Sequence, residues 1–386
     1  MAAVREFARK FDLVLKAFNL SRGRLAQTVG IDKSVVSRWA SGATVPTDHN
    51  LSLLTQAVMR HKADFGRADW DLDVEAFAAR LGLVAPAAAA PAASSGAAPP
   101  GPPGPTVPAG EQRIAFCRAP DGVRLAYATV GAGPPIVKTA NWLNHLEFDW
   151  ESPIYRGLFR GLAAERTLVR YDARGNGLSD WDVERIDFEA FVTDLETVMD
   201  AAGIGRAPVF CMSQGCAVAI AYAVRHPERV SHLILHGGFA VGPLRRSPDV
   251  AEQTRAMMHL IRTGWGTDNP AFRQMFTSLF FPDGTKEVFD SFNELQRVCI
   301  SPENAFRIRE AVGNIDVRDL LPKVKVPTLV THSRGDAVAS YELGRAMAAE
   351  IPGARFVTLQ SKNHALLDSE PAHARLLEEI RGFLAD

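Results

Sequence analysis

Hydrophobic and polar positions follow two different patterns on the two sides of residue 110. From residue 111 on, short Val/Ile/Leu runs alternate with longer amphipathic stretches, which is typical of a mainly parallel sheet covered by helices. The apolar runs predict strands at Ile136–Thr139, Thr167–Tyr171, Pro208–Met212, Ser231–Leu235, Thr328–Thr331 and Arg355–Leu359. The amphipathic stretches predict helices at Phe188–Ala202, Gly215–Arg225, Glu342–Glu350 and Pro371–Leu384. Ahead of them, Ile114–Cys117 and Val123–Thr129 flank the turn dipeptide Asp121-Gly122 and predict a hairpin.

Before residue 85 the apolar positions recur at helical spacing, and no alternating strand pattern is present. The recurring residues are Phe7, Phe11, Val14, Leu15 and Phe18, and later Leu51, Leu54 and Val58. This block is therefore predicted to be all helix.

The two blocks are joined by a segment of biased composition. Of the 26 residues from 85 to 110, 22 are Ala, Pro or Gly, and none is charged or aromatic. Such a segment buries too little apolar surface to offset the entropy lost on ordering it. We therefore expect a helical domain at 1–84, a linker at 85–110 and an α/β domain at 111–386.

Composition and charge exclude several classes of protein. With 47% hydrophobic and 23% charged residues the chain is an ordinary globular protein, and a net charge of −1 gives no global case for nucleic-acid or membrane binding. No run reaches the ~18–20 apolar residues of a membrane-spanning helix, and the charged amino terminus is unlike a signal peptide. The four cysteines lack metal-ligand spacing. We expect a cytoplasmic protein with reduced thiols and no metal or cofactor.

The segment around residue 30 has the features of two short helices joined by a tight turn. Leu25 and Val29 share one face of the first helix, Gly30 allows the turn, and Asp32 can cap the second helix. The second helix would carry Lys33, Ser34, Ser37 and Arg38 on its outer surface. The pattern Leu-Ala-x-x-x-Gly-Ile-x-x-x-x-Val-Ser-Arg-Trp-x-x-Gly-x-x-x-Pro, from residue 25 to 46, resembles the Cro/repressor-type helix-turn-helix family.

This resemblance implies that residues 33–39 form a recognition helix for the DNA major groove. Residues 1–67 hold 11 Lys+Arg against 5 Asp+Glu, a local charge of +6 in a nearly neutral chain. A helical docking or dimerisation module without DNA contacts is the alternative. One such domain has a small footprint on DNA, so we predict a homodimer.

In the α/β block the chemistry centres on Ser213. The run Pro208–Ala221 passes from a strand through a tight turn into a helix, which raises the serine above the sheet edge. The Gln214 N–H then lies at a helix start, where it can stabilise an anion. The motif would normally read Gly-x-Ser-x-Gly, and Cys211 replaces its first glycine.

A serine nucleophile needs a base and an orienting carboxylate. His364 follows the last predicted strand and Asp336 follows the one before it, so both lie at the same sheet edge as Ser213. His236 and His332, at strand ends, are weaker rivals for the base, and His226 is interpreted as a helix-end residue.

The order Ser213, Asp336, His364 resembles the α/β-hydrolase family over residues 111–386. The run Tyr171–Ser179 matches that family's Asp-x-Arg-Gly-x-Gly-x-Ser turn, interpreted here as structural. The family's second oxyanion donor follows a His-Gly pair. Ala140-Asn141 stands in its place, so the resemblance assigns that N–H to Trp142 by position. Asn141 or His145 could add a polar contact, although a surface-loop role is favoured for both.

Residues 239–322 interrupt the alternation of strands and helices and are predicted to be helical, which the resemblance identifies as a cap over the site. An apolar cap suits a small hydrophobic ester, lactone or amide. The first hypothesis is therefore a serine hydrolase; acyl transfer, carbon–carbon hydrolysis and perhydrolysis use the same triad. The alternative is a transcriptional regulator whose hydrolase-like domain senses, or slowly turns over, a small molecule.

Overall fold

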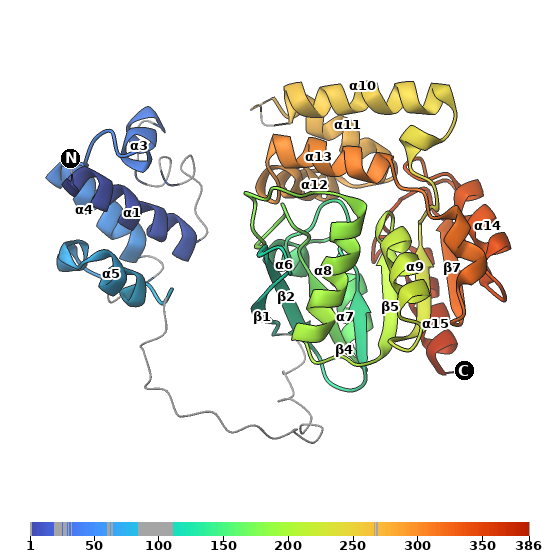
Figure 1. Cartoon of the computed structure of the whole chain (residues 1–386). Helices are drawn as coiled ribbons and strands as arrows, with labels where there is room; N and C mark the ends of the chain where they lie inside the picture. Colours follow the sequence, from blue (N-terminus) through green and yellow to red (C-terminus); the bar gives the residue numbers. More distant parts are fainter. Residues whose placement is uncertain are drawn as a thin grey trace, which may run out of the picture. The chain divides into compact units, whose positions relative to one another are not determined.

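The computed structural model describes residues 2–18, 25, 29, 31, 33–59, 62, 65–83, 111–265, 267 and 269–385. They form two compact units, and each unit has a hydrophobic core of its own. The predicted linker, residues 85–110, lies outside the described residues (Figure 1).

The first unit is helical over its described residues. Its elements are α1 (Ala2–Ala17), α3 (Lys33–Ala40), α4 (Asp48–Met59), the 3-10 helix η1 (Arg67–Asp71) and α5 (Val74–Arg80). Val36 and Trp39 of α3 are buried, and the Trp39 ring packs edge-on against Phe11 of α1. Leu25 and Val29 are helical and buried. The turn at residue 30 and the predicted cap at residue 32 lie outside the described part of the chain.

The second unit is built on one mixed sheet. Its strands are β1 (Arg113–Arg118), β2 (Arg124–Val130), β3 (Pro135–Lys138), β4 (Thr167–Tyr171), β5 (Ala207–Met212), β6 (Val230–His236), β7 (Thr328–Ser333) and β8 (Arg355–Leu359). They lie in the order β1-β2-β4-β3-β5-β6-β7-β8; β2 pairs antiparallel with β1 and β4, and the other pairs are parallel. Every residue of β5 and β7 is buried, as expected for central strands covered on both faces.

Helices cover both faces of this sheet. They are α6 (Leu146–Glu151), α7 (Arg156–Ala163), α8 (Phe188–Ala201), α9 (Gly215–Arg225), α14 (Tyr341–Glu350) and α15 (Pro371–Ala385). Helices α8 and α9 pack side by side, as do α7 and α15 (Figure 1). The sequence pattern predicted the six apolar strands, the hairpin and four of these helices to within two residues, and it missed α6 and α7.

A helical insert, residues 243–323, lies between β6 and β7. It holds η2 (Pro243–Arg245), α10 (Pro248–Gly264), α11 (Ala271–Phe280), α12 (Lys286–Val298), α13 (Pro302–Gly313) and η3 (Arg318–Lys323). Helices α10 to α13 gather at one end of the sheet, at the top of Figure 1. This end carries the loops that follow the parallel strands, where α/β proteins place their sites.

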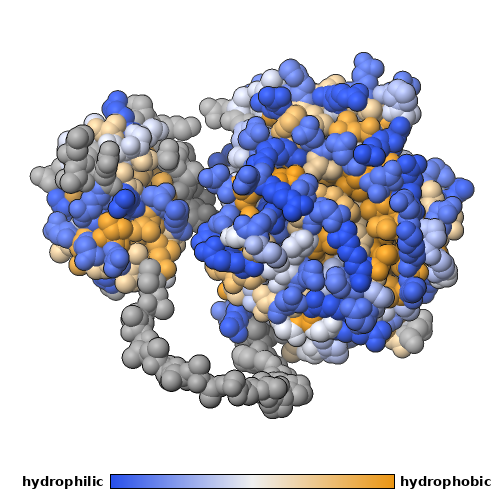
Figure 2. Space-filling model, viewed as in Figure 1, coloured by the Kyte–Doolittle hydropathy of each residue, from blue (hydrophilic) through white to orange (hydrophobic). Residues whose placement is uncertain are grey.

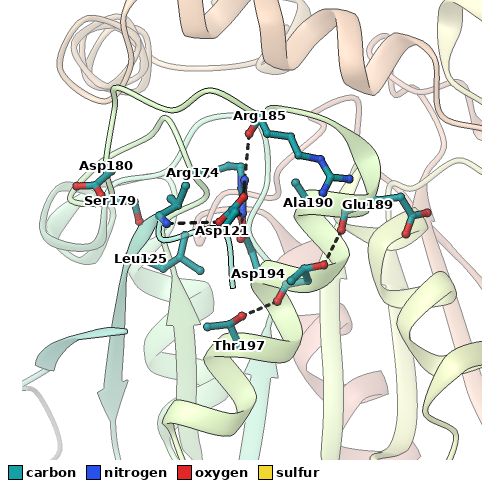
Figure 3. Close-up of polar contacts among 12 residues, drawn as sticks. Asp121, Leu125, Arg174, Ser179, Asp180, Arg185, Glu189, Ala190, Asp194 and Thr197 are labelled. Atoms are coloured by element: carbon teal, nitrogen blue, oxygen red, sulfur yellow. Dashed lines mark hydrogen bonds and ion pairs between the residues drawn. The ribbon is translucent and has the colours of Figure 1, made fainter. Parts of the chain in front are cut away.

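The turn after β4 is held by Arg174, which is completely buried. Its guanidinium donates to both carboxylate oxygens of Asp194, at 2.9 and 2.7 Å, and to Asp121 at 2.6 Å. It also donates to the Arg185 carbonyl at 3.0 Å, and Figure 3 shows this group of side chains. Because these protein groups accept hydrogen bonds from its guanidinium, Arg174 stabilises the turn, in agreement with the structural role expected from the sequence.

Hydrophilic residues cover much of the visible face of the second unit, with apolar residues between them (Figure 2). Among its described residues, the large apolar side chains that are clearly exposed are Phe116 and Trp181. No helix in the described ranges is both long and apolar enough to cross a membrane.

Candidate active site

The turn from β5 into α9 forces Ser213 into an unusual backbone conformation. Its φ is +54°, and it is the one residue other than glycine with a positive φ among those described. Non-glycine residues adopt this region at a cost, and such strain is concentrated at functional sites. The Ser213 N–H donates to the His236 carbonyl at 3.0 Å, and the residue is half-buried. The turn therefore presents the hydroxyl at the sheet edge.

Small residues allow the turn to be this tight. A Cβ on Gly215 would lie 2.4 Å from the Thr139 hydroxyl and 2.9 Å from the Ala140 carbonyl. Cys211, at the place of the expected glycine, is buried, and its thiol donates to the Ile234 carbonyl at 3.2 Å. The departure at Cys211 is thus accommodated within the paired strands β5 and β6.

His364 and Asp336 come together at the same edge. His364 Nδ1 lies 2.7 Å from Asp336 Oδ2, and Asp336 Oδ1 accepts from the Val338 and Ala339 N–H groups at 2.8 and 3.0 Å. Burial raises the pKa of Asp336, but His364 and the backbone donors lower it by a larger amount. The pKa of Asp336 therefore lies below its usual value. The His364 N–H donates to the carbonyl of Phe280, at the end of α11, at 2.8 Å. The helical insert thus fixes the backbone of this histidine.

Ser213 and His364 line one pocket beneath the helical insert. Its other lining residues are Asn141, Trp142, Leu143, Tyr155, Met212, Gln214, Phe280, Phe292 and Ala365. Its empty volume is about 320 Å³, including the part open to solvent. His364 Nε2 is buried and has no hydrogen-bond partner among the described residues. The imidazole is therefore held at Nδ1 and left open at the nitrogen that can exchange a proton.

The two predicted anion donors also line this pocket. Neither the Trp142 nor the Gln214 backbone N–H donates a hydrogen bond to another described residue. The loop that carries Trp142 is fixed by Asn141, whose Oδ1 accepts from Lys138 Nζ and whose Nδ2 donates to the Leu143 carbonyl at 2.8 Å. The side chain of Asn141 thus holds the loop at the position where the family has His-Gly.

The surface-loop role expected for His145 is wrong. His145 is buried at the start of α6, where its Nδ1 accepts from the Phe148 N–H at 3.3 Å. Burial, with a smaller effect of Arg170, lowers the pKa of His145 to about 4. It therefore acts as a neutral helix cap.

The rival histidines, His236 and His332, do not line the pocket with Ser213. His236 Nδ1 lies 2.9 Å from the Thr331 hydroxyl, and His332 Nε2 lies 2.8 Å from the Ala339 carbonyl. Burial lowers the pKa of both rings, that of His236 to about 3. His226 caps the end of α9, as the sequence predicted.

The sequence analysis missed a group of buried charges beneath the Trp142 loop. Lys138 of β3, Asp149 of α6, Arg170 of β4 and Asp172 are all buried. Burial lowers the pKa of Lys138 to about 8 and raises that of Asp149 to about 6 and that of Asp172 to about 7. Lys138 and Arg170 lie within apolar strands, whereas Asp149 lies among charged residues and Asp172 belongs to the turn at 171–179 that the sequence analysis interpreted as structural, so no shared pattern marks the four as a cluster. Within the described ranges, no group of side chains could hold a metal ion.

The fold and this arrangement of residues define a class of protein, and comparison with known families agrees. The model of the alpha/beta hydrolase fold family matches residues 149–371, and the chain belongs to that family. It is an enzyme of the alpha/beta hydrolase fold.

Two relatives and one solved structure illustrate the similarity. The AB hydrolase superfamily protein YisY of Bacillus subtilis is 25% identical, over 66% of this chain and 94% of its own. The pimeloyl-[acyl-carrier protein] methyl ester esterase of Neisseria meningitidis is 27% identical, over 52% of this chain and 82% of its own. The esterase EaEST from Exiguobacterium antarcticum, 23% identical, superimposes with a TM-score of 0.61 over 70% of this chain and 99% of its own. The residues matched by the family model, 149–371, lie within the second unit.

Proposed function

We propose that the chain is a serine hydrolase whose nucleophile is Ser213, with His364 as the base and Asp336 as its orienting carboxylate. One observation carries the proposal. The strained serine and a histidine held at Nδ1 by a carboxylate share one pocket, and the other histidine nitrogen has no partner.

The proposed reaction has two halves. Ser213 Oγ attacks the carbonyl carbon while His364 Nε2 takes the hydroxyl proton, and the N–H groups of Trp142 and Gln214 receive the charge on the carbonyl oxygen. When the bond to the leaving group breaks, His364 returns that proton to the leaving atom. Water then attacks the acyl-serine in the same way, which frees the acid and restores the hydroxyl.

An ester, lactone or amide of a small molecule fits the site best. Apolar side chains of Tyr155, Phe280 and Phe292 line the pocket around the serine. The name of the Neisseria relative specifies a methyl ester, and that of the Exiguobacterium protein an esterase. These names support acyl-ester chemistry ahead of the other reactions that a serine triad performs.

A fluorophosphonate probe and a series of p-nitrophenyl esters of increasing acyl length test this function. We expect the wild type to be labelled and to hydrolyse the esters. Ser213→Ala should lose the label, and its kcat should fall by a factor on the order of 10³ or more, because the nucleophile is absent.

Ser278→Ala is the matched control, since Ser278 is an exposed serine of α11, and it should label like the wild type. An unlabelled wild type would overturn the enzymatic proposal. Equal labelling of wild type and Ser213→Ala would show that another residue is the nucleophile.

A second function is favoured by the surface of the first unit: we propose that it binds DNA through α3 as a homodimer. Helix α3 buries an apolar face and leaves Arg38 exposed and Ser37 half-buried. The side chains of Lys33 and Ser34, the other proposed contacts, lie outside the described part of the chain. The local charge of +6 over residues 1–67 supports phosphate contacts. With the hydrolase unit, this would make a regulator that binds or turns over its effector.

A further inference from the structure

Arg309 is a cation without a counter-charge next to the candidate active site. It lies on α13, with its Cζ 4.8 Å from the centroid of the Trp142 ring, and it is half-buried. It forms no hydrogen bond or ion pair with any described residue. Burial, with a smaller effect of the charge of Arg246, lowers the pKa of Arg309 to about 10. A guanidinium has five N–H donors, and those of Arg309 are not fully buried, so they are accessible to an acceptor that binds here.

Arg246 is a second such cation, from a neighbouring segment of the helical insert. It lies between η2 and α10, which both pack against α13. Its Cζ is 5.1 Å from the centroid of the Phe239 ring, and its Nε donates to the Val241 carbonyl at 3.0 Å. No carboxylate of a described residue pairs with it, and burial lowers its pKa to about 10. The charge of Arg246 contributes to the lowered pKa of Arg309, and no carboxylate of a described residue offsets either charge.

Further donors without acceptors lie in the same region. The indole Nε1 groups of Trp142 and Trp265 are both buried and have no partner within the described part of the chain. The two rings pack with their centroids 5.4 Å apart. A buried polar group left unbonded is destabilising. Cations and N–H donors accumulate here, and a carboxylate can accept hydrogen bonds from both kinds of group.

We propose that Arg309 and Arg246, with the two indole N–H groups, bind a carboxylate of the substrate. The esters hydrolysed at Ser213 would then carry a free carboxylate away from the bond that is cleaved. Planar guanidinium groups favour carboxylates because two parallel N–H donors match the two oxygens. This inference rests on the proposed serine hydrolase and defines its substrate class.

The position of Trp142 connects this anion site to the reacting bond. Trp142 lines the pocket of Ser213 and also carries Arg309 on its ring. The carboxylate would therefore lie within a short acyl chain of the scissile carbonyl. The apolar side chains of Phe280 and Phe292 would cover the methylene groups between the two ends.

Paired methyl esters of dicarboxylic acids test the proposal. The wild type is assayed on the monomethyl and dimethyl esters of each acid, from succinate to azelate. We expect kcat/KM for the best half-ester to exceed that of its neutral diester by about tenfold or more, as for hydrogen bonds to a charged group. In Arg309→Met and in Arg246→Met the ratio of the two values should fall toward one. The ratio of the two kcat/KM values is compared because Arg309 packs on the Trp142 ring, so its loss can lower the turnover of both esters.

Arg262→Met is the matched control. Arg262 is an exposed arginine of α10 that lies on the Phe306 ring at 4.8 Å, and its loss should leave the ratio unchanged. Acetate esters of ω-hydroxy acids form the second arm of the experiment. Their free carboxylate is on the alcohol part of the ester, whereas that of the half-esters is on the acyl part. A preference in either arm that depends on both arginines supports the proposal.

Calorimetry on Ser213→Ala gives a readout without turnover. Half-ester should bind this variant, and the added Arg309→Met should weaken binding about tenfold or more. Equal turnover of charged and neutral esters in both arms, or a preference that survives both arginine substitutions, would overturn the carboxylate site. That result would leave the serine hydrolase in place, whereas a wild type that hydrolyses none of these esters and takes no fluorophosphonate would overturn both.

Discussion

At the scale of single residues, the hydrogen bonds of Asp336 determine how His364, the proposed base, is oriented. Asp336 receives three donors, one from His364 and two from the backbone, and they outweigh the effect of burial on its pKa. His332 adds a second imidazole 3.6 Å from Asp336 Oδ2. The carboxylate is thus kept ionised and oriented, which fixes the proton of His364 on Nδ1 and frees Nε2.

Asp336→Asn should change both activity and the pH dependence of stability. An amide favours the wrong imidazole tautomer, so kcat should fall by a factor on the order of 10³–10⁴. A carboxyl whose pKa is lowered in the folded state contributes stability above its usual pKa of about 4, and that contribution is lost as pH falls through the folded pKa. The free energy of unfolding of the wild type should therefore exceed that of Asp336→Asn by a constant amount above about pH 5, and this difference should shrink below pH 5.

Urea unfolding at a series of pH values measures that difference. Asp319→Asn is the control, because Asp319 is exposed on η3, and its curve should stay parallel to that of the wild type. A difference between wild type and Asp336→Asn that does not change with pH would contradict the assigned pKa shift.

At the scale of elements, the turn between β5 and α9 depends on the close approach of the loop after β3. Gly215 begins α9 where a methyl group would overlap Thr139 and Ala140, just before the residues that carry the Trp142 N–H. The turn at Ser213 and the position of the proposed anion donors therefore both depend on the close contact between Gly215 and the loop after β3.

Gly215→Ala should lower stability by roughly 1–3 kcal/mol, as overpacking does. It should also lower kcat, because the loop of Trp142 must move. Gly382→Ala is the matched control: Gly382 is an exposed residue of α15 with open space around its Cβ position. That variant should gain about 0.5–1 kcal/mol from helix propensity and keep full activity. A Gly215→Ala enzyme with wild-type stability and kcat would refute this account of the turn.

Prediction from sequence worked where an element has a periodic pattern or a fixed chain order. The strands were found in this way, and chain order selected Ser213, Asp336 and His364 as the candidate triad, which stays a prediction. Short α6 and α7 were missed because each has only a turn or two of pattern. Arg309 and Lys138 could not be found, since their significance depends on which side chains of other elements lie beside them.

At the scale of the whole molecule, positive charge is concentrated in one part of the first unit. The core of the first unit contains residues up to 81, and that of the second begins after the linker. Residues 1–67 carry +6, but residues 68–84 hold four Asp+Glu against one Arg, which reduces the first unit to +3 and leaves −4 for residues 85–386. The charge distribution therefore favours residues 1–67 as the surface for the proposed DNA contacts.

If the first unit binds DNA, the full chain should shift duplex DNA in a gel at low salt, with an affinity that falls steeply as salt is raised. Arg38→Ala should weaken binding and reduce the slope of log K against log salt by about 0.9, because one phosphate contact is lost. Arg345→Ala, which removes an exposed arginine of α14 paired with Glu342, should bind like the wild type. Sedimentation in the same buffer should show a dimer. Absence of any shift at low salt would remove DNA binding and leave the first unit as a docking module, while a strictly monomeric chain that still shifts DNA would refute the dimer alone.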